Sequence, residues 1–201
     1  MPRIVDHAAR RAVVHEALWR VIGRVGLEHA STREIAREAG LSLGALNHYF
    51  ANKDEMLISA HELGFGRARD RILATGRGKR GVAALRHALF ESLPLDEERL
   101  LEAHVDVSFC AHAVTNPRLA EARRESHVEL RRLLYGVLAE AREDGELRDG
   151  LRDSDVVDDW VTLVDGASVQ ALMEGPSDDL RRRQERQAEH FLARLRRTPG
   201  A

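Results

Sequence analysis

The sequence has few aromatic residues, a single cysteine and no long apolar run, and each shortage argues against a class of protein. Aromatic residues make up 4% of the 201 residues, too few for a β-sandwich or barrel, because strands favour aromatic and β-branched side chains. One cysteine cannot form an internal disulfide framework, which fits a reducing cytoplasm. No apolar stretch approaches the roughly 20 residues that cross a bilayer, and the charged first ten residues predict no signal peptide. We therefore expect a cytoplasmic protein that has no contact with a membrane.

Helix-forming residues are abundant. Ala, Leu, Glu, Lys and Arg account for 103 of the 201 residues, a share typical of helical proteins. Apolar residues recur at helical spacing between glycine and proline breaks, which predicts an all-α fold. The nine predicted helices span about 6–25, 32–39, 43–50, 52–74, 82–92, 96–114, 117–144, 155–173 and 178–197.

The charge of the chain is unevenly distributed. Residues 1–53 hold eight basic and five acidic side chains, and the net charge of the whole chain is −2, so the other 148 residues have a net charge of −5. A modestly basic head on an acidic body is compatible with binding a polyanion at one end of the molecule.

The segment after the first predicted helix has the pattern of a helix-turn-helix. Ser31 and Glu34 form a capping box that starts a short helix. Ala36 is small where two helices cross closely, and Gly40 stands where the chain must turn sharply, often with positive φ. Leu46 can fill the angle between the helices. The pattern indicates a DNA-binding corner whose second helix enters the major groove, or else an ordinary tight corner in a helical bundle.

Residues 31–53, STREIAREAGLSLGALNHYFANK, resemble the TetR-type family of bacterial transcriptional repressors. The matching elements are Ile35-Ala36, Ala39-Gly40, Ser42, Gly44, Leu46, Tyr49-Phe50 and Lys53, with a long helix before and after. The resemblance implies an N-terminal helix-turn-helix domain over 1–52 and a larger helical ligand-binding and dimerisation domain over 53–201. It also implies a non-enzymatic repressor without a cofactor, which a small molecule releases from a palindromic operator.

The resemblance and the chemistry of base edges together predict the residues that contact DNA. Asn47 stands where a tyrosine is frequent in the family, and its amide can bind adenine or reach a phosphate. His48 is open to the same two roles. Thr32, Tyr49 and Lys53 resemble the family's phosphate contacts, which position the protein without reading sequence. The predicted DNA-binding residues are Thr32, Arg33, Ser42, Leu43, Gly44, Ala45, Asn47, His48, Tyr49 and Lys53.

The last two predicted helices, about 155–173 and 178–197, have apolar stripes. We expect them to form a homodimer interface of two helices from each subunit, and packing within one chain is the alternative. The small residues Gly166, Ala167 and Ser168 would permit close approach at a two-fold axis. The stripes consist of Val157, Trp160, Val161, Val164, Ala167, Ser168 and Ala171 in one helix and Leu180, Ala188, Phe191, Leu192 and Leu195 in the other.

The resemblance implies a small-molecule pocket in the larger domain. Asp106 stands in a stretch where the family often has bulky aromatics, so it can face a cationic or hydroxylated ligand, or pair with an arginine at the surface. His104 is a ligand contact or a buried histidine bonded to the backbone. The helix over 52–74 joins the two domains and would act as a lever. The predicted ligand-binding residues are Phe65, Phe90, His104, Asp106, Phe109, Tyr135 and Trp160.

The sequence has no motif for a P-loop that binds phosphate and none for a metal site. The glycine-rich stretch 75–81 has neither the preceding strand nor the Ser or Thr after lysine that a P-loop requires. The ten histidines include no His-Glu-x-x-His, and there is no cysteine pair, so we expect no metal site. A helical ligand-binding or enzymatic bundle that does not bind DNA, and a dimeric protein-interaction module, are the alternatives with the same helix pattern.

Overall fold

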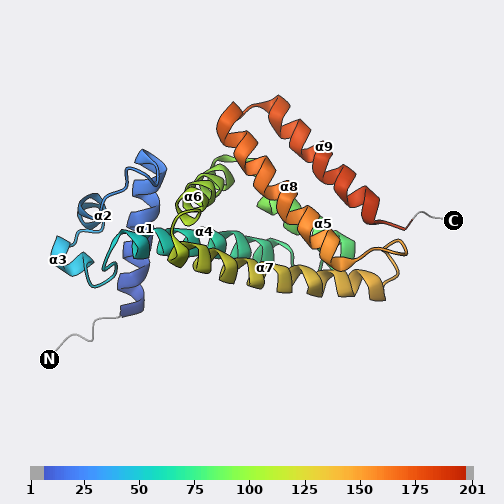
Figure 1. Cartoon of the computed structure of the whole chain (residues 1–201), viewed down its shortest axis with the longest axis horizontal. Helices are drawn as coiled ribbons and strands as arrows, with labels where there is room; N and C mark the ends of the chain where they lie inside the picture. The colour runs from blue at the N-terminus through green and yellow to red at the C-terminus, as the bar shows by residue number, and fades with distance from the viewer. Residues whose placement is uncertain (1–6, 198–201) are drawn as a thin grey trace. The chain divides into compact units, whose positions relative to one another are not determined.

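The protein is all-helical in this computed structural model, which describes residues 7–197 (Figure 1). Nine helices lie within those residues, which confirms the predicted fold class. They are α1 (His7–Val25), α2 (Thr32–Glu38), α3 (Leu43–Leu46), α4 (Lys53–Thr75), α5 (Gly81–Ser92), α6 (Glu97–Ala113), α7 (Pro117–Glu143), α8 (Asp153–Glu174) and α9 (Asp178–Leu195). None of these helices is both long and apolar enough to cross a membrane.

The chain divides into two compact units. Unit 1 contains α1, α2, α3, the part of α4 up to Phe65, and His104–Arg123 from α6 and α7. Unit 2 contains Gly66–Ala103 and the chain from Arg124 onward. Three helices, α4, α6 and α7, therefore contribute residues to both units.

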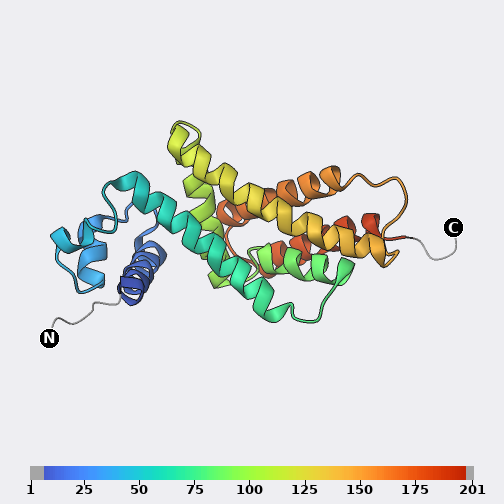
Figure 2. The ribbon, with the colours of Figure 1, turned by 90° about the horizontal axis from the view of Figure 1, so that it is seen from below.

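Unit 1 has its core on the apolar face of α1. Val14, Leu18 and Ile22 follow one another every four residues along this face and are buried. Ile35 of α2 and Leu46 of α3 are buried as well, and α2 contacts both α1 and α3 (Figure 2). Burying each of these side chains stabilises the fold by about 1.5–3 kcal/mol, so the short helices are held by packing rather than by their own helix propensity.

Side-chain N-caps, Ser31 and Asn52, set where α2 and α4 begin. Ser31 Oγ accepts a hydrogen bond from the Glu34 amide at 3.3 Å, and Asn52 Oδ1 accepts one from the Glu55 amide at 3.0 Å. The Glu55 carboxylate reaches back and accepts a hydrogen bond from the Ala51 amide at 2.8 Å. These bonds satisfy amides that a helix start otherwise leaves unpaired, and they fix the N-terminus of α4 beside the helix-turn-helix.

The turn between α2 and α3 uses the one residue type that tolerates it. Gly40 has φ +67°, a left-handed conformation that is strained for a residue with a Cβ. The Leu41 amide then donates to the Ala36 carbonyl at 2.8 Å and closes the corner. Any other residue at position 40 would strain the angle at which α3 leaves α2.

The third helix is shorter than its predicted span of 43–50. It ends at Leu46, and residues 47–49 continue as turns. The His48 amide donates to the Ala45 carbonyl at 3.3 Å, and the Tyr49 amide donates to the Leu46 carbonyl at 2.8 Å. These bonds span three residues rather than four, so the chain tightens after one helical turn.

Unit 2 has a continuous apolar core between α5, α7, α8 and α9. Its buried members include Leu85 and Leu89 of α5, Leu134 and Leu138 of α7, and Trp160 of α8. Figure 1 shows α8 and α9 as neighbours that run in opposite directions. The unit therefore has the layered helix packing of a bundle.

The apolar stripes of α8 and α9 are buried within the chain, which corrects the argument that they need a partner subunit. Val157, Trp160, Ala167, Ser168 and Ala171 of α8 are buried, and so are Leu180, Ala188, Phe191, Leu192 and Leu195 of α9. Val161 and Val164 are half-buried against the same core. Of the small residues expected at a two-fold axis, only Gly166 is exposed. Helical periodicity marks a buried face but does not say which chain covers it.

Two polar contacts fix the position of α9. Gln184 is 1% exposed, and its Nε2 donates to the Ala167 carbonyl of α8 at 2.9 Å. At the end of α9, an isolated antiparallel bridge pairs Leu147 with Arg196. The Arg148 amide donates to the Leu195 carbonyl at 2.9 Å, so the connection between α7 and α8 is bonded to the C-terminal end of α9.

Arg71 joins α4, α5 and α6 within unit 2. Its guanidinium donates to both carboxylate oxygens of Glu102 at 2.7 Å and to Glu91 at 3.0 Å. The side chains of Arg71 and Glu102 are only 18% and 12% exposed. The bonds to Glu102 raise the pKa of Arg71, whereas burial raises the pKa of Glu102 against the opposing effect of Arg71.

Candidate nucleic-acid interface

The corner formed by α2 and α3 presents a short exposed surface. Leu43, Gly44, Asn47 and His48 are exposed, and Ala45 is half-buried. Leu46 and Phe50, on the other side of this segment, are buried in unit 1. The predicted base-contacting side chains therefore share one solvent face of a segment whose opposite face is anchored in the core.

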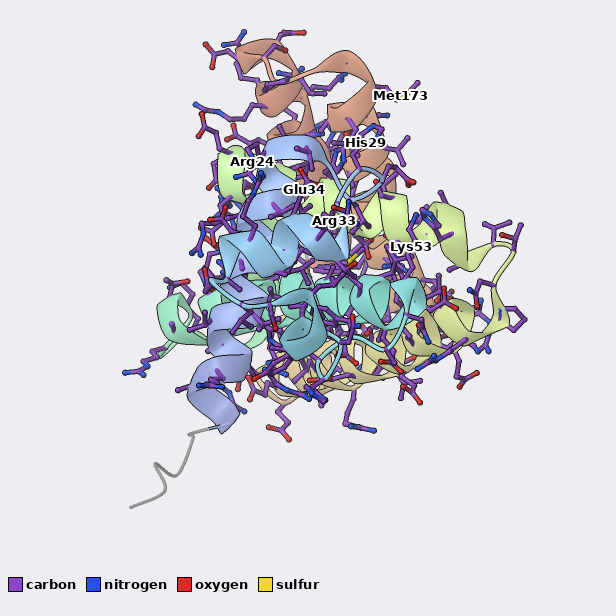
Figure 3. The ribbon with its side chains drawn as sticks, turned by 90° about the vertical axis from the view of Figure 1, so that its left-hand side faces the viewer. Arg24, His29, Arg33, Glu34, Lys53 and Met173 are labelled. Carbon is purple, nitrogen blue, oxygen red and sulfur yellow. The ribbon has the colours of Figure 1, made fainter. Side chains whose placement is uncertain are left out.

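Unpaired cations flank this exposed segment. Arg33 and Arg37 of α2 and Lys53 of α4 are exposed, and within the described residues none of them has an ion-pair partner. Figure 3 shows Arg33 and Lys53 on the side of unit 1 that faces the viewer. Thr32 and Tyr49, the other predicted phosphate contacts, are half-buried beside them. Cations of this kind are available to a phosphate backbone.

Arg37 is a residue that the sequence analysis missed. It follows Arg33 by four residues, so both side chains project from one face of α2. The spacing was visible in the sequence, but a second arginine on a helix surface is too common to single out without knowing which face is buried. The structure buries Ile35 and Ala36 and leaves the two arginines in solvent.

One acidic residue of α2, Glu38, is paired with two arginines of α1. Arg20 Nε donates to Glu38 Oε1 at 2.8 Å, and Arg24 Nη1 donates to Glu38 Oε2 at 3.2 Å. These hydrogen bonds, Arg20 first, hold the pKa of Glu38 below its ordinary value. The carboxylate at the end of α2 therefore adds little negative charge to a surface that would approach DNA.

Ser42 has a structural role at the start of α3. Its Oγ accepts a hydrogen bond from the Ala45 amide at 3.1 Å, so it is the N-cap of the helix. The hydroxyl proton stays available as a donor. Ser42 can therefore cap α3 and still donate to a phosphate oxygen.

A cavity of about 170 Å³ lies in unit 1 beside Tyr49. Its walls also include His15 of α1 and Ser59 of α4. The His15 Nε2 and Ser59 Oγ atoms are 3.1 Å apart and form a hydrogen bond between the two helices. Burial, and then the charge of Arg11, lower the pKa of His15, so a neutral imidazole is favoured next to the predicted phosphate contact.

Four of the predicted effector contacts lie in unit 1, namely Phe65, His104, Asp106 and Phe109. The Asp106 carboxylate accepts a hydrogen bond from Arg123, and its Oδ1 lies 3.3 Å from His61 Nδ1. His61 is 3% exposed and stacks on the Phe109 ring with centroids 4.3 Å apart. Asp106 is thus paired within the chain, and His61 is a member of this group that the sequence analysis did not name. Phe65 and His104 are half-buried.

The other three predicted effector contacts, Phe90, Tyr135 and Trp160, lie in unit 2. Arg86 covers the Phe90 ring, with the guanidinium carbon 4.3 Å from the ring centroid. Tyr135 is 39% exposed on α7. Trp160 is 2% exposed, and its Nε1 is buried without a hydrogen-bond partner among the described residues. A buried donor left unsatisfied costs about 1–3 kcal/mol.

A helix-turn-helix with exposed cations beside its exposed segment is typical of a DNA-binding regulator. The comparisons with known proteins agree. Residues 15–60 match the family profile described as bacterial regulatory proteins, tetR family, and residues 81–197 match the BetI-type transcriptional repressor, C-terminal. The chain belongs to the TetR family of transcriptional regulators and has a C-terminal domain of the BetI type.

Individual relatives cover nearly the whole chain. The HTH-type transcriptional regulator PksA of Bacillus subtilis (strain 168) is 36% identical over 176 residues, which are 87% of this chain and 84% of that protein. A transcriptional regulator from Rhodococcus sp. Rha1 is 33% identical with a TM-score of 0.74, over 94% of this chain and 98% of that one. A putative regulator from Saccharomonospora viridis, solved in complex with choline, has a TM-score of 0.81 at 20% identity, over 95% and 99% of the two chains. This last likeness shows the shared fold.

Family membership confirms the resemblance in the sequence and decides between its alternatives. The corner at Gly40 is a helix-turn-helix of the TetR type rather than an ordinary bundle corner. The family consists of regulators and not of enzymes, so the enzymatic bundle is set aside. The contacts of individual residues with DNA and with an effector stay predictions.

Proposed function

We propose that the protein is a cytoplasmic repressor that binds a palindromic operator as a symmetric homodimer and leaves it when a small molecule binds. The observation that carries the proposal is a set of exposed cations next to the exposed face of α3, namely Arg33, Arg37 and Lys53, which have no ion-pair partner among residues 7–197. The segment from Leu43 to His48 would lie in the major groove, where Asn47 and His48 reach base edges. Arg37 and Lys53 would hold the phosphates on either side.

The dimer would form on the face of α8 that the chain itself leaves open. Thr162, Gly166, Val169 and Met173 are exposed and recur at intervals of four, three and four residues, so they form one stripe. Val169 is 47% exposed and Met173 is 83% exposed. A Cβ added at Gly166 would meet nothing within 4 Å, which leaves room for a second helix. Two copies of α8 and α9 would then form a four-helix interface.

The effector would bind in the larger domain. The resemblance to a regulator solved with choline supports a small molecule as the signal. In unit 2, Trp160 offers a buried hydrogen-bond donor inside an apolar core. A ligand bound next to Trp160 would alter the packing of α5, α7 and α8, because these helices share the core that surrounds it.

A mobility-shift and footprinting experiment on DNA upstream of the protein's own gene tests the proposal. We expect a protected palindrome with half-sites about 34 Å apart, or a multiple of that distance, because a two-fold dimer presents two copies of α3. The logarithm of the binding constant should fall linearly with the logarithm of salt concentration. A single asymmetric half-site, or no binding at low salt, would contradict the proposal.

A further inference from the structure

Three groups that a cationic effector could use are already paired with arginines of this chain: Phe90 with Arg86, Glu102 with Arg71, and Asp106 with Arg123. Quaternary ammonium ions are bound over the faces of aromatic rings and next to carboxylates. In unit 2 one face of the half-buried Phe90 ring is covered by Arg86, which is itself held by a 2.8 Å hydrogen bond from its Nε to Glu189 on α9. A second cation over the same ring would be repelled by the guanidinium.

Two carboxylates are likewise paired with arginines. Glu102, the most buried carboxylate of the Arg71 group in unit 2, accepts two hydrogen bonds from Arg71 at 2.7 Å. Asp106, the predicted anionic contact in unit 1, is bonded to Arg123 and lies beside His61. Neither of these carboxylates offers an uncompensated charge to a cation.

Trp160 differs from these paired groups, because its indole nitrogen has no hydrogen-bond partner among the described residues. The indole is 2% exposed and belongs to a core of leucines, valines, alanines and Phe191, mainly from α5, α7, α8 and α9. Its Nε1 is buried and makes no hydrogen bond with any residue that the structure describes. An indole N–H is a donor only, so its missing partner is an acceptor such as an oxygen. The surroundings add no charge, so the molecule that supplies this oxygen is otherwise apolar.

We propose that the effector is an uncharged, mainly apolar molecule whose oxygen accepts a hydrogen bond from Trp160 Nε1, and that it is not a quaternary ammonium ion. This rests on the proposed function, because it places the effector of the repressor in unit 2. The effector class thus differs from the choline bound by the structural relative from Saccharomonospora viridis. The difference comes from Arg86, Arg71 and Trp160, which are side chains of this chain and not properties of the shared fold.

Choline and 3,3-dimethyl-1-butanol form a matched pair of probes for this inference. The two molecules have the same shape and the same hydroxyl group, and they differ in whether the central atom is a charged nitrogen or a neutral carbon. The chain has two tryptophans, so Trp19→Phe leaves Trp160 as the sole tryptophan emitter. We expect 3,3-dimethyl-1-butanol to shift the Trp160 emission and raise the melting temperature, and choline at the same concentration to do neither.

A second variant separates the hydrogen bond from the volume of the ring. Trp160→Phe keeps an aromatic side chain and removes the N–H, so it should bind 3,3-dimethyl-1-butanol about fivefold more weakly in the otherwise natural protein. Circular dichroism of both variants checks that they fold. The proposal is overturned if choline binds as tightly as the alcohol, if Trp160→Phe binds the alcohol as tightly as the natural protein, or if the alcohol leaves Trp160 emission unchanged.

The failure of this inference is distinguishable from failure of the proposed function. The operator mobility shift is carried out on the same protein without any probe. If operator binding is present and the alcohol does not bind, only the effector class is wrong. If operator binding is absent, the proposed function is wrong whatever the alcohol does.

Discussion

Lys53 and Asn47 are six positions apart, and we expect them to contribute to DNA binding in different ways. Lys53→Ala should weaken binding to all sequences alike and lower the salt slope by about 0.9 for each subunit, because a phosphate contact releases counterions and reads no base. Asn47→Ala should change base preference and cost about 1–3 kcal/mol at the positions it reads. Selection of binding sites from a random DNA library with each variant measures both effects.

The other lysine provides the matched control. Lys79 lies in the loop between α4 and α5, where its Nζ donates to the Thr75 carbonyl at 3.1 Å. Lys79→Ala removes the same charge and should leave the salt slope unchanged. A shift in the selected consensus with Lys53→Ala would show that its assignment to a phosphate is wrong.

His15 makes the stability of unit 1 depend on pH. Its pKa is lowered in the folded protein, first by burial and then by Arg11. As the pH falls below the ordinary histidine value of 6.5, the unfolded chain takes up a proton that the folded chain resists, so stability falls. His15→Gln can retain a hydrogen bond to Ser59 and has no such proton, so its loss of stability between about pH 6.5 and 4.5 should be smaller. Urea unfolding of both proteins across this range measures the difference, and parallel curves would contradict the prediction.

At the scale of elements, Arg71 is expected to hold α4 to α5 and α6. Arg71→Ala would leave Glu102 buried without its partner, and breaking a buried pair costs about 3 kcal/mol or more. Arg69 is the matched control on the same helix, since its side chain is 39% exposed and its partner Glu129 is 42% exposed. Arg69→Ala should cost less than about 1 kcal/mol. Chemical denaturation compares the two variants, and equal losses would mean that the Arg71 group contributes no more than a surface pair.

Elements whose ends have local causes could be predicted from the sequence. The N-cap at Ser31, the cap at Asn52 and the positive φ of Gly40 are decided by residues within four positions. The end of α3 could not be predicted in this way. Its sequence continues with residues that tolerate a helix, and the turn at 47–49 follows from burying Leu46 and Phe50 together in unit 1.

The two candidate sites, for DNA and for the effector, also differ in how far they could be predicted from the sequence. The residues around α3 could be predicted because they lie within about twenty positions and resemble a known motif. The effector contacts come from helices far apart in sequence, and a single sequence does not say which of them meet. Phe90 was predicted to contact an effector, for example, and nothing in the sequence indicated that Arg86 covers its ring from the preceding turn of α5.

At the scale of the whole molecule, the open stripe of α8 predicts the dimer. Val169→Glu would place a charge at the centre of this stripe and should yield a monomer of 22.5 kDa in sedimentation at micromolar concentration, where we expect twice that mass for the natural protein. Val128→Glu is the matched control, because Val128 is 56% exposed on α7. That variant should stay dimeric. A monomeric natural protein would remove the basis of the palindromic operator.

Coupling between effector and operator has to be reciprocal. Helix α4 runs without interruption from Lys53 to Thr75 and contributes to both units, so it is a continuous element through which a ligand can act. A ligand that weakens operator binding is weakened by the operator to the same factor, typically about 5–150-fold. Titration of 3,3-dimethyl-1-butanol with and without operator DNA measures this factor. Equal affinity in the two titrations would mean that the protein represses without induction through Trp160.

The bridge between Leu147 and Arg196 also has a consequence for the lifetime of the protein in a cell. The C-terminal end of α9 is hydrogen-bonded to the connection that precedes α8. Both ends of the segment formed by α8 and α9 are therefore held together. A protease that pulls on the chain after Arg197 must first separate the bridge, and only then can it unwind α9. Fusion of a degradation signal behind Arg197 should therefore act slowly, and cutting the chain back to Leu195 before fusing the signal should shorten the half-life.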